Sequence, residues 1–369
     1  MDWDSIASGA SGEDLASYLR GLPGYPVYIY GAGCFGRELF KVFSDNGIRV
    51  EGFVDRNAEK CGDLPIPVQH PEELDEKSSV NLILGIVMNL ADRVELEKHL
   101  SRMGYAHILD GQAVRAHYVF PLEPAGRQDP VRYYSRYLTE IKAAEQLFSD
   151  DESLDTYRRN LSAHIKRDYA GCAQTKGKKQ YFVDDVPFSK GFSRFIDCGA
   201  YIGDTLQELC RTGSDIEAVA AFEPSLLNFA RLAEKYESGL AGNIRHAVLF
   251  PCGVASGTKM QPFSSMGGSS TTLGDGEDRI VSVGIDDVLK NFAPTFIKMD
   301  VEGFEREAIW GAAQTIAHYS PKMMVSLYHR NEDIFELPLL IKSLNPNYRM
   351  FIRHQLYIPA WETNLYAVL

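Results

Sequence analysis

Cysteine is scarce in this sequence, and no two cysteines stand at the spacing of a metal or redox motif. The chain has 6 cysteines among 369 residues and contains no Cys-x-x-Cys pair. A disulfide framework or a zinc ribbon is therefore not expected as the basis of the fold. Scattered single cysteines are typical of reduced thiols, so we expect a cytoplasmic protein.

The sequence also lacks a long apolar run. The strongest one, at residues 80–90, is interrupted by two asparagines and a glycine. A helix that crosses a bilayer needs about 20 apolar residues, so we expect no membrane span. Residues 1–4 show neither the basic segment nor the apolar core of a secretory signal.

An excess of positive charge is absent too. Lys and Arg together number 38 and Asp and Glu number 50, which gives a formal net charge of −12. Nucleic acids and anionic membranes bind basic surfaces, so neither is expected as the main partner. The 45% hydrophobic and 24% charged residues are typical of a folded protein. The length is too great for one ordinary core and suits two α/β domains with a connector.

Two segments, in each of which a strand, a glycine loop and a helix follow one another, predict two α/β domains with parallel sheets. We place a Rossmann-like domain at residues 1–119, a helical connector at residues 120–190 and a second α/β sheet domain at residues 191–369. The last domain is expected to be doubly wound with seven strands, the final two forming an antiparallel pair at the edge. Its expected strands are 194–197, 218–222, 244–250, 295–299, 322–327, 348–352 and 365–368, and its expected helices are 205–211, 226–236, 304–317 and 334–344.

The first glycine loop has the pattern of a dinucleotide-binding fingerprint. Gly31, Gly33 and Gly36 lie between an apolar strand and a helix, and Asp55 ends the next strand. Glycines let a backbone approach a pyrophosphate, and the acid would accept hydrogen bonds from ribose hydroxyls. The same loop also serves tight packing of a helix on a strand without any nucleotide, so both interpretations stand. The region resembles the small Rossmann-like domains attached to sugar-modifying enzymes.

The second glycine loop differs because it carries acidic side chains. Asp197 ends an apolar strand, Gly199 and Gly203 permit a tight turn, and Asp204 is expected to cap the next helix. Glu223 ends the following strand, at the position of a ribose-binding acid. Carboxylates repel phosphates and attract cations. S-adenosylmethionine has the matching character, with ribose hydroxyls, a sulfonium and an ammonium group.

Downstream motifs carry a resemblance to a known family. The hallmark is Lys298-x-Asp300-x-Glu302-Gly303-x-Glu305 followed by Trp310-Gly311-Ala312, with supporting matches at Asp197-x-Gly199-Ala200-x-x-Gly203-Asp204, Phe222-Glu223-Pro224, Ile285-Asp286-Asp287-Val288-Leu289, Leu327-Tyr328-His329-Arg330 and Glu362-Thr363-Asn364-Leu365-Tyr366. In these residues the segment 192–369 resembles the FkbM-type S-adenosylmethionine-dependent methyltransferases. The resemblance implies the class I methyltransferase fold. It also implies methyl transfer, usually to a hydroxyl oxygen of a sugar or natural product.

The resemblance also implies which residues contact the cofactor. It assigns Asp197, Gly199 and Gly203 to the cofactor loop, Glu223 to the ribose, and Asp300 to a strand end facing the methyl group. The other expected cofactor-binding residues are Cys198, Ala200, Asp204, Thr205, Pro224 and Gly253.

Methyl transfer to an unactivated hydroxyl needs a general base. The candidates are Asp300, Glu302 and His329, each at or just past the end of an expected strand, where ligands of open α/β sheets gather. Each has a structural alternative: Asp300 as a cap of the next helix, Glu302 as a partner of Arg306, and His329 as a packing residue. No metal is expected, because no compact His/Asp/Glu cluster is visible in the sequence.

Three further expectations follow. Lys298 should pair with an acid at the sheet edge, and residues 264–278 should form a loop that either gates the substrate or is an ordinary surface excursion. The expected partners are a small-molecule or glycan acceptor and, as an open possibility, a second copy of the chain. Two alternatives to a methyltransferase remain: a scaffold with two degenerate nucleotide folds, and an NAD-dependent oxidoreductase that uses Gly31, Gly33 and Gly36.

Overall fold

The chain divides into two compact units. The computed structural model describes residues 21–62, 64–86, 90–111, 130–166, 181–188, 191–265, 271–273, 278–355 and 362–369, together with Trp3 and Val114. The first unit comprises residues 1–138, 158–174 and 356–361, and the second comprises residues 139–157, 175–355 and 362–369. Among the helices of these described ranges, none is long and apolar enough to cross a membrane.

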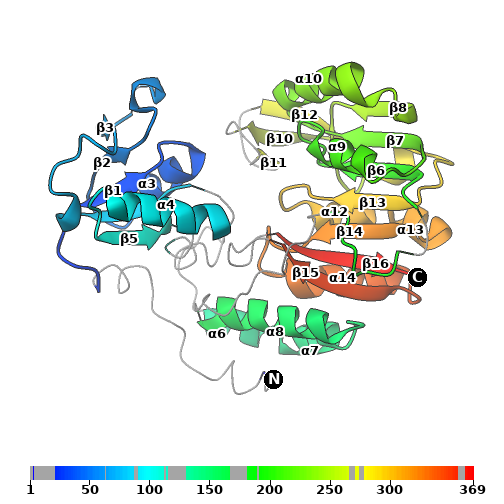
Figure 1. The fold of residues 1–369 in the computed structure, drawn as a ribbon. Coiled ribbons are helices and arrows are strands. Elements are labelled where there is room, and N and C mark those ends of the chain that lie inside the picture. The colour runs from blue at the N-terminus through cyan, green and yellow to red at the C-terminus, as the bar shows by residue number, and fades with distance from the viewer. Residues whose placement is uncertain are drawn as a thin grey trace. The chain divides into compact units, whose positions relative to one another are not determined.

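The first unit contains a five-stranded sheet in the order β3-β2-β1-β4-β5, with every strand parallel to its neighbours (Figure 1). The strands are β1 (Val27–Tyr30), β2 (Val50–Val54), β3 (Val68–Gln69), β4 (Asn81–Leu84) and β5 (His107–Asp110), and the helices are α3 (Cys34–Asp45), α4 (Leu90–Arg102) and α6 (Pro130–Ser135). A Cβ atom on Gly36 would lie 1.9 Å from the carbonyl oxygen of Gly31, so only glycine lets α3 pack this closely on the loop after β1. The expected Rossmann-like architecture of the first sheet is confirmed.

The second unit contains the expected seven-stranded sheet, in the order β15-β16-β14-β13-β6-β7-β8 (Figure 1). Its strands are β6 (Arg194–Cys198), β7 (Ile216–Phe222), β8 (Ile244–Phe250), β13 (Phe296–Met299), β14 (Lys322–Ser326), β15 (Arg349–His354) and β16 (Thr363–Val368). The antiparallel pairing of the last two strands is confirmed, with β16 between β14 and the edge strand β15. The other neighbours are parallel, as βα repeats require.

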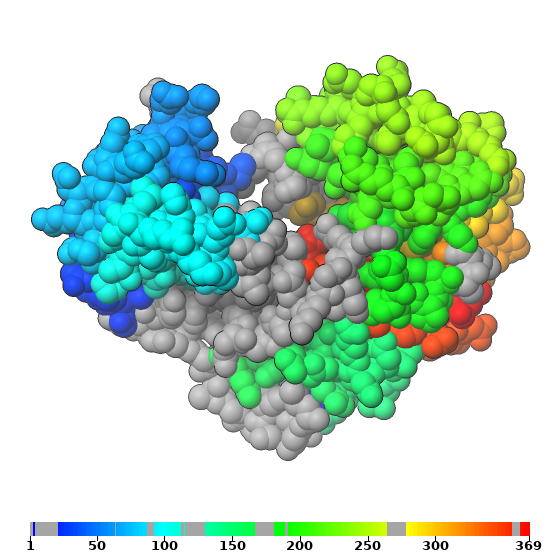
Figure 2. Space-filling view, in the orientation of Figure 1, coloured from blue at the N-terminus to red at the C-terminus, as the bar shows by residue number. Residues whose placement is uncertain are grey.

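Helices lie between most of these strands: α9 (Asp204–Arg211), α10 (Leu226–Lys235), α11 (Ile285–Val288), α12 (Glu305–Trp310), α13 (Ala313–Tyr319) and α14 (Asp333–Leu344). Two more helices, α7 (Leu138–Glu145) and α8 (Asp151–Lys166), precede β6 in the sequence, and the division between the two units falls within α8. The space-filling view in Figure 2 shows α10 at the surface of the second unit, and its Leu226 is 72% exposed.

The prediction of one helix over residues 304–317 is wrong, because the chain breaks there into α12 and α13. The break falls at Gly311, where a Cβ atom would lie 2.0 Å from the carbonyl oxygen of Ala255. The carbonyl oxygen of Gly311 also accepts a hydrogen bond from the amide of Asp286. A close backbone approach between distant segments therefore ends α12, which periodicity within the helix does not reveal.

An additional small sheet was not expected from the sequence. It has the order β11-β10-β12-β9 and is made of β9 (Gly253–Val254), β10 (Lys259–Ser265), β11 (Thr271–Leu273) and β12 (Asp278–Val283). The prediction of a loop over residues 264–278 is therefore wrong for the part that is described. Residues 266–270 and 274–277 of that prediction lie outside the described residues. Residues 264–278 are rich in Gly, Ser and Thr, a composition that is typical of a loop, so the strands could not be predicted from composition alone.

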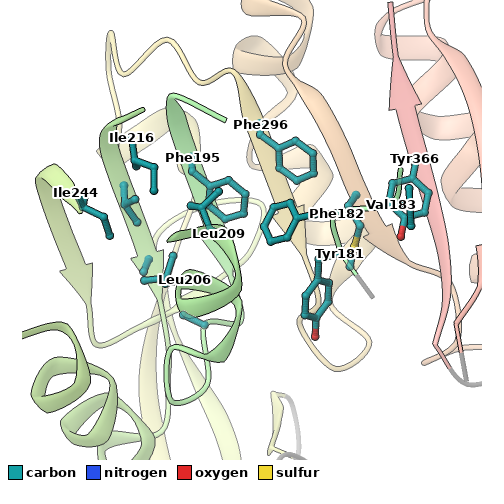
Figure 3. Packing of buried hydrophobic residues seen from close by; sticks show 14 of the residues in the cluster. Tyr181, Phe182, Val183, Phe195, Leu206, Leu209, Ile216, Ile244, Phe296 and Tyr366 are labelled. Carbon is teal, nitrogen blue, oxygen red and sulfur yellow. The ribbon is translucent and has the colours of Figure 1, made fainter. Parts of the chain in front are cut away.

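Aromatic rings fill one face of the seven-stranded sheet. The rings of Phe195 on β6 and Phe296 on β13 are stacked, with centroids 5.2 Å apart. Phe182, from the segment before the sheet, packs 6.0 Å from Phe195 and 6.3 Å from Phe296, as Figure 3 shows. Segment 181–188 is therefore part of the core of the second unit, although it precedes the first strand of the sheet.

A buried arginine ties edge strand β15 to two segments that precede the sheet in the sequence. The side chain of Arg353 is 1% exposed and bonds Asp150 at 2.6 Å and Asp185 at 2.5 Å. Glu152 lies 3.6 Å away, and the hydroxyl of Ser153 accepts from the same guanidinium at 3.0 Å. We call Arg353 with Asp150 and Asp185 the arginine clasp.

Candidate active site at the carboxyl ends of the central strands

The topological switch point of the seven-stranded sheet lies between β6 and β13. From β6 the strand order runs to β7 and β8 on one side and to β13 and β14 on the other. The loops after the two central strands touch, because a Cβ atom on Gly199 would lie 1.8 Å from the carbonyl oxygen of Asp300. The amide of Asp300 also donates to the carbonyl oxygen of Cys198 at 3.0 Å. Open α/β sheets bind ligands at this point.

The loop after β6 has the left-handed backbone that its glycines permit. Gly199 has φ +87° and Gly203 has φ +80°. Tyr201, which is not a glycine, has φ +47° and so holds a conformation that costs free energy. The expectation that Asp204 caps the next helix is wrong: Gly203 is the N-cap residue, and Asp204 begins α9. Asp204 still places a negative charge in the first turn, where the helix dipole favours it.

A buried ion pair contacts the backbone of this loop. Lys298 on β13 lies 3.0 Å from Asp197 on β6, and their side chains are 2% and 0% exposed. The Lys298 ammonium also donates to the carbonyl oxygen of Gly199 at 2.8 Å. The expected pairing of Lys298 with an acid is thus confirmed. The other Asp197 oxygen, Oδ2, is buried without a hydrogen-bond partner among the described residues.

Both members of this pair are charged at neutral pH. Burial raises the pKa of Asp197 to about 6, although the charge of Lys298 opposes that rise. Burial lowers the pKa of Lys298, but the carboxylates around it, Asp197 first, outweigh burial and raise it above its usual value. The pair therefore places an ionised carboxylate under the loop.

Glu223, the acid that follows β7, is hydrogen-bonded to the same loop. Its Oε2 accepts from the amide of Tyr201 and its Oε1 from the amide of Ser225, each at 2.9 Å. The residue is 3% exposed, and burial raises the pKa of its carboxyl to about 7. The side chain of Asn228 also hydrogen-bonds this carboxylate, whose two oxygens together still have acceptor capacity for a ligand.

The first unit repeats this construction with Asp55. Its Oδ2 accepts from the amide of Ala32 in the glycine loop at 2.9 Å, and its Oδ1 accepts from the amide of Asn57 at 2.8 Å. Packing against the loop explains why residue 36 is a glycine. Residue 31 is a glycine because its φ of +100° is one that side chains disfavour. Gly33 has neither constraint: its φ is −74°, and a Cβ atom there would meet nothing within 4 Å. Close packing of the helix therefore accounts for Gly36, and the left-handed backbone accounts for Gly31.

Three acids surround one histidine beyond the ends of β13 and β14. His329 Nδ1 lies 2.8 Å from Glu305 Oε1. His329 Nε2 lies 3.6 Å from Asp300 Oδ1 and 3.5 Å from Glu302 Oε2. The structure thus brings together all three residues expected as the general base, and it adds Glu305. We call Asp300, Glu302, Glu305 and His329 the acid–histidine cluster.

Charge and burial set the protonation of this cluster. Burial lowers the pKa of His329, but Glu305, Glu302 and Asp300 outweigh burial and raise it well above its usual value. Burial raises the pKa of Glu302 to about 7, even though the charge of His329 opposes this. Tyr328 donates from its hydroxyl to Asp300 Oδ1 at 3.1 Å, and burial raises its pKa well above the usual value.

The structural alternatives for the acids are not observed. The N-cap of α12 is Phe304 without a side-chain hydrogen bond, so Asp300 does not cap that helix. Arg306 pairs with Glu336 at 3.2 Å rather than with Glu302. Glu305 and Tyr328 stand within the motifs that carry the family resemblance, but no role at the site was expected of them, because their partners lie 24 and 28 residues away.

No metal was expected because the sequence shows no compact His/Asp/Glu cluster. The fold nevertheless brings such a cluster together. Among the described residues, Asp300, Glu305 and His329 each offer one atom that could bind a metal ion. These three atoms lie within 4.8 Å of one another. However, Glu305 Oε1 already accepts from the amide of Val301 at 2.8 Å and faces the imidazole. Because this oxygen is already engaged on both sides, we assign no metal to this cluster.

The remaining expected cofactor residues fall into two groups. Cys198 ends β6, Ala200 lies in the loop after it and Thr205 lies in the first turn of α9; all three are buried, and Pro224 follows Glu223. Gly253 belongs to another element, since it begins β9 and is paired with Ser282 of β12.

Comparisons with known proteins found a family model and solved structures that are similar to this chain. Residues 197–359 match the family model of the methyltransferase FkbM domain. The crystal structure of the methyltransferase FkbM from Methylobacillus flagellatus KT is similar over 99% of this chain and 97% of that chain, with a TM-score of 0.67 and 22% identity. Aeropyrum pernix fibrillarin, crystallised with bound S-adenosyl-L-methionine, covers 50% of this chain and 70% of its own at a TM-score of 0.33 and 8% identity, which does not establish a common fold. No curated protein matches the sequence.

Proposed function

We propose that this chain, whose residues 197–359 match the family model of the methyltransferase FkbM domain, transfers a methyl group from S-adenosylmethionine to a hydroxyl oxygen of a sugar, glycan precursor or natural product. One observation carries the proposal beyond the domain match. The loop at the switch point of the sheet, residues 199–203, contains no Lys or Arg, and the carboxylate of Asp197 is buried beneath it with the ammonium of Lys298 as its partner, among the described residues, on one oxygen only. That charge suits a cationic nucleoside and disfavours a dinucleotide.

The residues present fit this cofactor. Asp197 Oδ2 is buried and lacks a partner among the described residues, so an incoming ammonium would satisfy it. Glu223 stands at the end of β7, where a ribose is bound in open sheets, and its oxygens retain acceptor capacity. The cofactor, when bound, supplies an electrophilic methyl group on a positively charged sulfur.

The acid–histidine cluster would receive the acceptor. Methyl transfer forms a carbon–oxygen bond and breaks the carbon–sulfur bond, whose electron pair stays on sulfur. The hydroxyl proton has to leave, and Asp300, Glu302 and His329 are the groups at hand to take it. The products are a methyl ether, S-adenosylhomocysteine and one proton. Asp300 follows β13 directly, so it joins the cofactor loop to this cluster.

Calorimetric titration tests the cofactor assignment. In titrations of the full chain, we expect S-adenosylmethionine to bind at the site of Asp197 and Glu223. We expect no binding of NAD at that site. Glu223→Gln and Asp197→Asn should each weaken binding about tenfold or more, because each removes a charge from a buried hydrogen-bonding carboxylate. Asp215→Asn is the matched control, since this acid lies on the surface with its side chain 74% exposed.

Three outcomes separate the functions. Binding of S-adenosylmethionine that is weakened by the two site variants and not by Asp215→Asn supports the methyltransferase. Binding of NAD alone, lost with Asp55→Asn, would favour an oxidoreductase. Binding of neither would favour a scaffold and contradict the proposal.

The first unit has a specific observation of its own. Gly33 is free of any packing requirement, which suits a ligand that approaches the loop closely. We propose that this unit recognises the acceptor through a nucleotide or sugar. Titration with a nucleotide sugar, in the wild type and in Gly33→Ala, tests this, and equal binding by the two proteins would contradict it.

A further inference from the structure

The imidazole of His329 is held at both ring nitrogens by carboxylates. Glu305 lies in the first turn of α12 with its side chain 0% exposed. Its Oε1 is fixed by the amide of Val301 at 2.8 Å and faces His329 Nδ1 at 2.8 Å. The opposite ring nitrogen, Nε2, then points to Asp300 and Glu302. A rigid, buried acceptor at Nδ1 sets both the orientation and the charge of the ring.

We propose that Glu305 is a positioning residue that keeps His329 as a fixed imidazolium, and that the acceptor's hydroxyl proton goes to the carboxylate of Glu302 rather than to His329. This inference rests on the proposed methyl transfer and names the base for it. His329 would hold the carboxylate of Glu302 in place by charge.

Carboxyl groups from three elements surround His329. Glu305 comes from α12, Asp300 and Glu302 from the loop after β13, and Asp333 from α14. Burial alone would neutralise a histidine, yet Glu305, Glu302 and Asp300 raise its pKa well above its usual value. An imidazolium has no lone pair, so it cannot accept the hydroxyl proton.

Glu302 has the properties of the base. The charged groups that face it are His329, Asp300, Glu305 and Glu362. Burial raises its pKa to about 7, and a base works best when its pKa lies near the pH of operation. Its side chain is 29% exposed, so it can reach a ligand. Asp300 differs, because its Oδ1 already accepts the hydroxyl of Tyr328.

The backbone at Glu302 supports this assignment. Glu302 has φ +54° and Gly303 has φ +93°, so a residue with a side chain occupies the left-handed region. Such a conformation costs about 1–3 kcal/mol and persists only where the surroundings impose it. The hydrogen bond from the amide of Val301 to Glu305 is one such constraint, since it fixes the backbone directly before Glu302.

The proton balance of the step is complete. The acceptor oxygen attacks the methyl carbon, the carbon–sulfur pair leaves with sulfur, and the hydroxyl proton bonds to Glu302. Glu302 then returns the proton to solvent, and His329 keeps its two protons throughout. No oxidant, reductant or metal enters the step.

The protonation of His329 can be measured without any turnover. We expect side-chain nitrogen NMR to show both ring nitrogens of His329 protonated at pH 7.5 in the wild type. Glu305→Gln should leave one nitrogen unprotonated at that pH, while Glu234→Gln on the exposed face of α10 should change nothing. A neutral His329 in the wild type would overturn the proposal, whether or not the protein methylates an acceptor.

The pH profile of kcat/KM separates the two candidate bases by direction. If Glu302 is the base, Glu305→Gln removes the positive charge of His329, which lowers the pKa of Glu302, together with the smaller opposing effect of the Glu305 charge, so the rising limb moves up. If His329 is the base, losing Glu305 makes its proton easier to remove, and the limb moves down. Glu305→Asp should restore most of the wild-type profile.

A second pair of variants covers the case in which Glu305→Gln does not fold. His329→Lys keeps a cation and should retain the position of the rising limb, whereas His329→Gln should move it up. Equal loss of activity in both would identify His329 as the base and overturn the proposal. Glu302→Gln should lower kcat at least about 100-fold with little change in cofactor binding. Unchanged kcat would overturn it as well.

Discussion

Removing the ammonium of Lys298 should destabilise the second unit more than almost any other single charge deletion. In Lys298→Met, Asp197 stays 0% exposed with no partner for its charge, and the carbonyl oxygen of Gly199 loses its donor. Breaking a buried pair by deleting one partner costs about 3–5 kcal/mol, because the remaining charge is uncompensated. Methionine has nearly the same length, so packing changes little. We therefore expect a loss of free energy of unfolding within that range.

Chemical denaturation followed by circular dichroism measures this loss, taken from the transition of the second unit. The exposed Lys290→Met is the control and should stay within about 0.5 kcal/mol of the wild type. Adding Asp197→Asn to Lys298→Met removes the stranded charge, so the double variant should regain at least about 1 kcal/mol. A Lys298→Met protein within 1 kcal/mol of the wild type would refute the reasoning, as would a double variant less stable than the single one.

Three further predictions concern the site. Asp300→Asn should lower turnover about tenfold or more while the cofactor Kd stays within about twofold, since this acid faces the acceptor; unchanged turnover would remove it from the reaction. A chelator should leave activity intact, and activity lost to EDTA and restored by one divalent ion would show that the acid–histidine cluster binds a metal. The free energy of unfolding should fall by about 2 kcal/mol between pH 6 and pH 8, because Glu223 and Glu302, each with a pKa of about 7, bind protons more tightly in the folded chain than in the unfolded one. A carboxyl group whose pKa is raised on folding stabilises the folded chain fully at a pH below its pKa in the unfolded chain, and this stabilisation is lost as the pH rises through its pKa in the folded chain. Glu302→Gln should make the free energy of unfolding depend less on pH. A free energy of unfolding that rises between pH 6 and pH 8 would contradict the assignment.

Local patterns in the sequence predicted what depends on neighbours along the chain. The seven strands, their antiparallel ending and the glycine loop with Asp197 all follow from apolar runs, turn residues and spacing. The break at Gly311 and the small sheet of β9 to β12 could not be seen, because each depends on contact with a distant segment.

The candidate site divides in the same way. Strand ends pointed to Asp300, Glu302 and His329, since side chains after parallel strands meet at one edge. The role of Glu305 was hidden, because it lies within a helix and reaches His329 only after α12 folds back on the loop before it. Protonation was equally out of reach: whether His329 is a base or a cation depends on how many acids surround it.

The arginine clasp has a practical consequence for anyone who shortens this protein. A truncated version starting at residue 191 would keep Arg353 and discard Asp150 and Asp185, the two carboxylates that neutralise it. An orphaned guanidinium inside a folded body favours misfolding and aggregation during expression. Trimming should therefore stop ahead of residue 139, which leaves the acids of the clasp on the same polypeptide as their arginine.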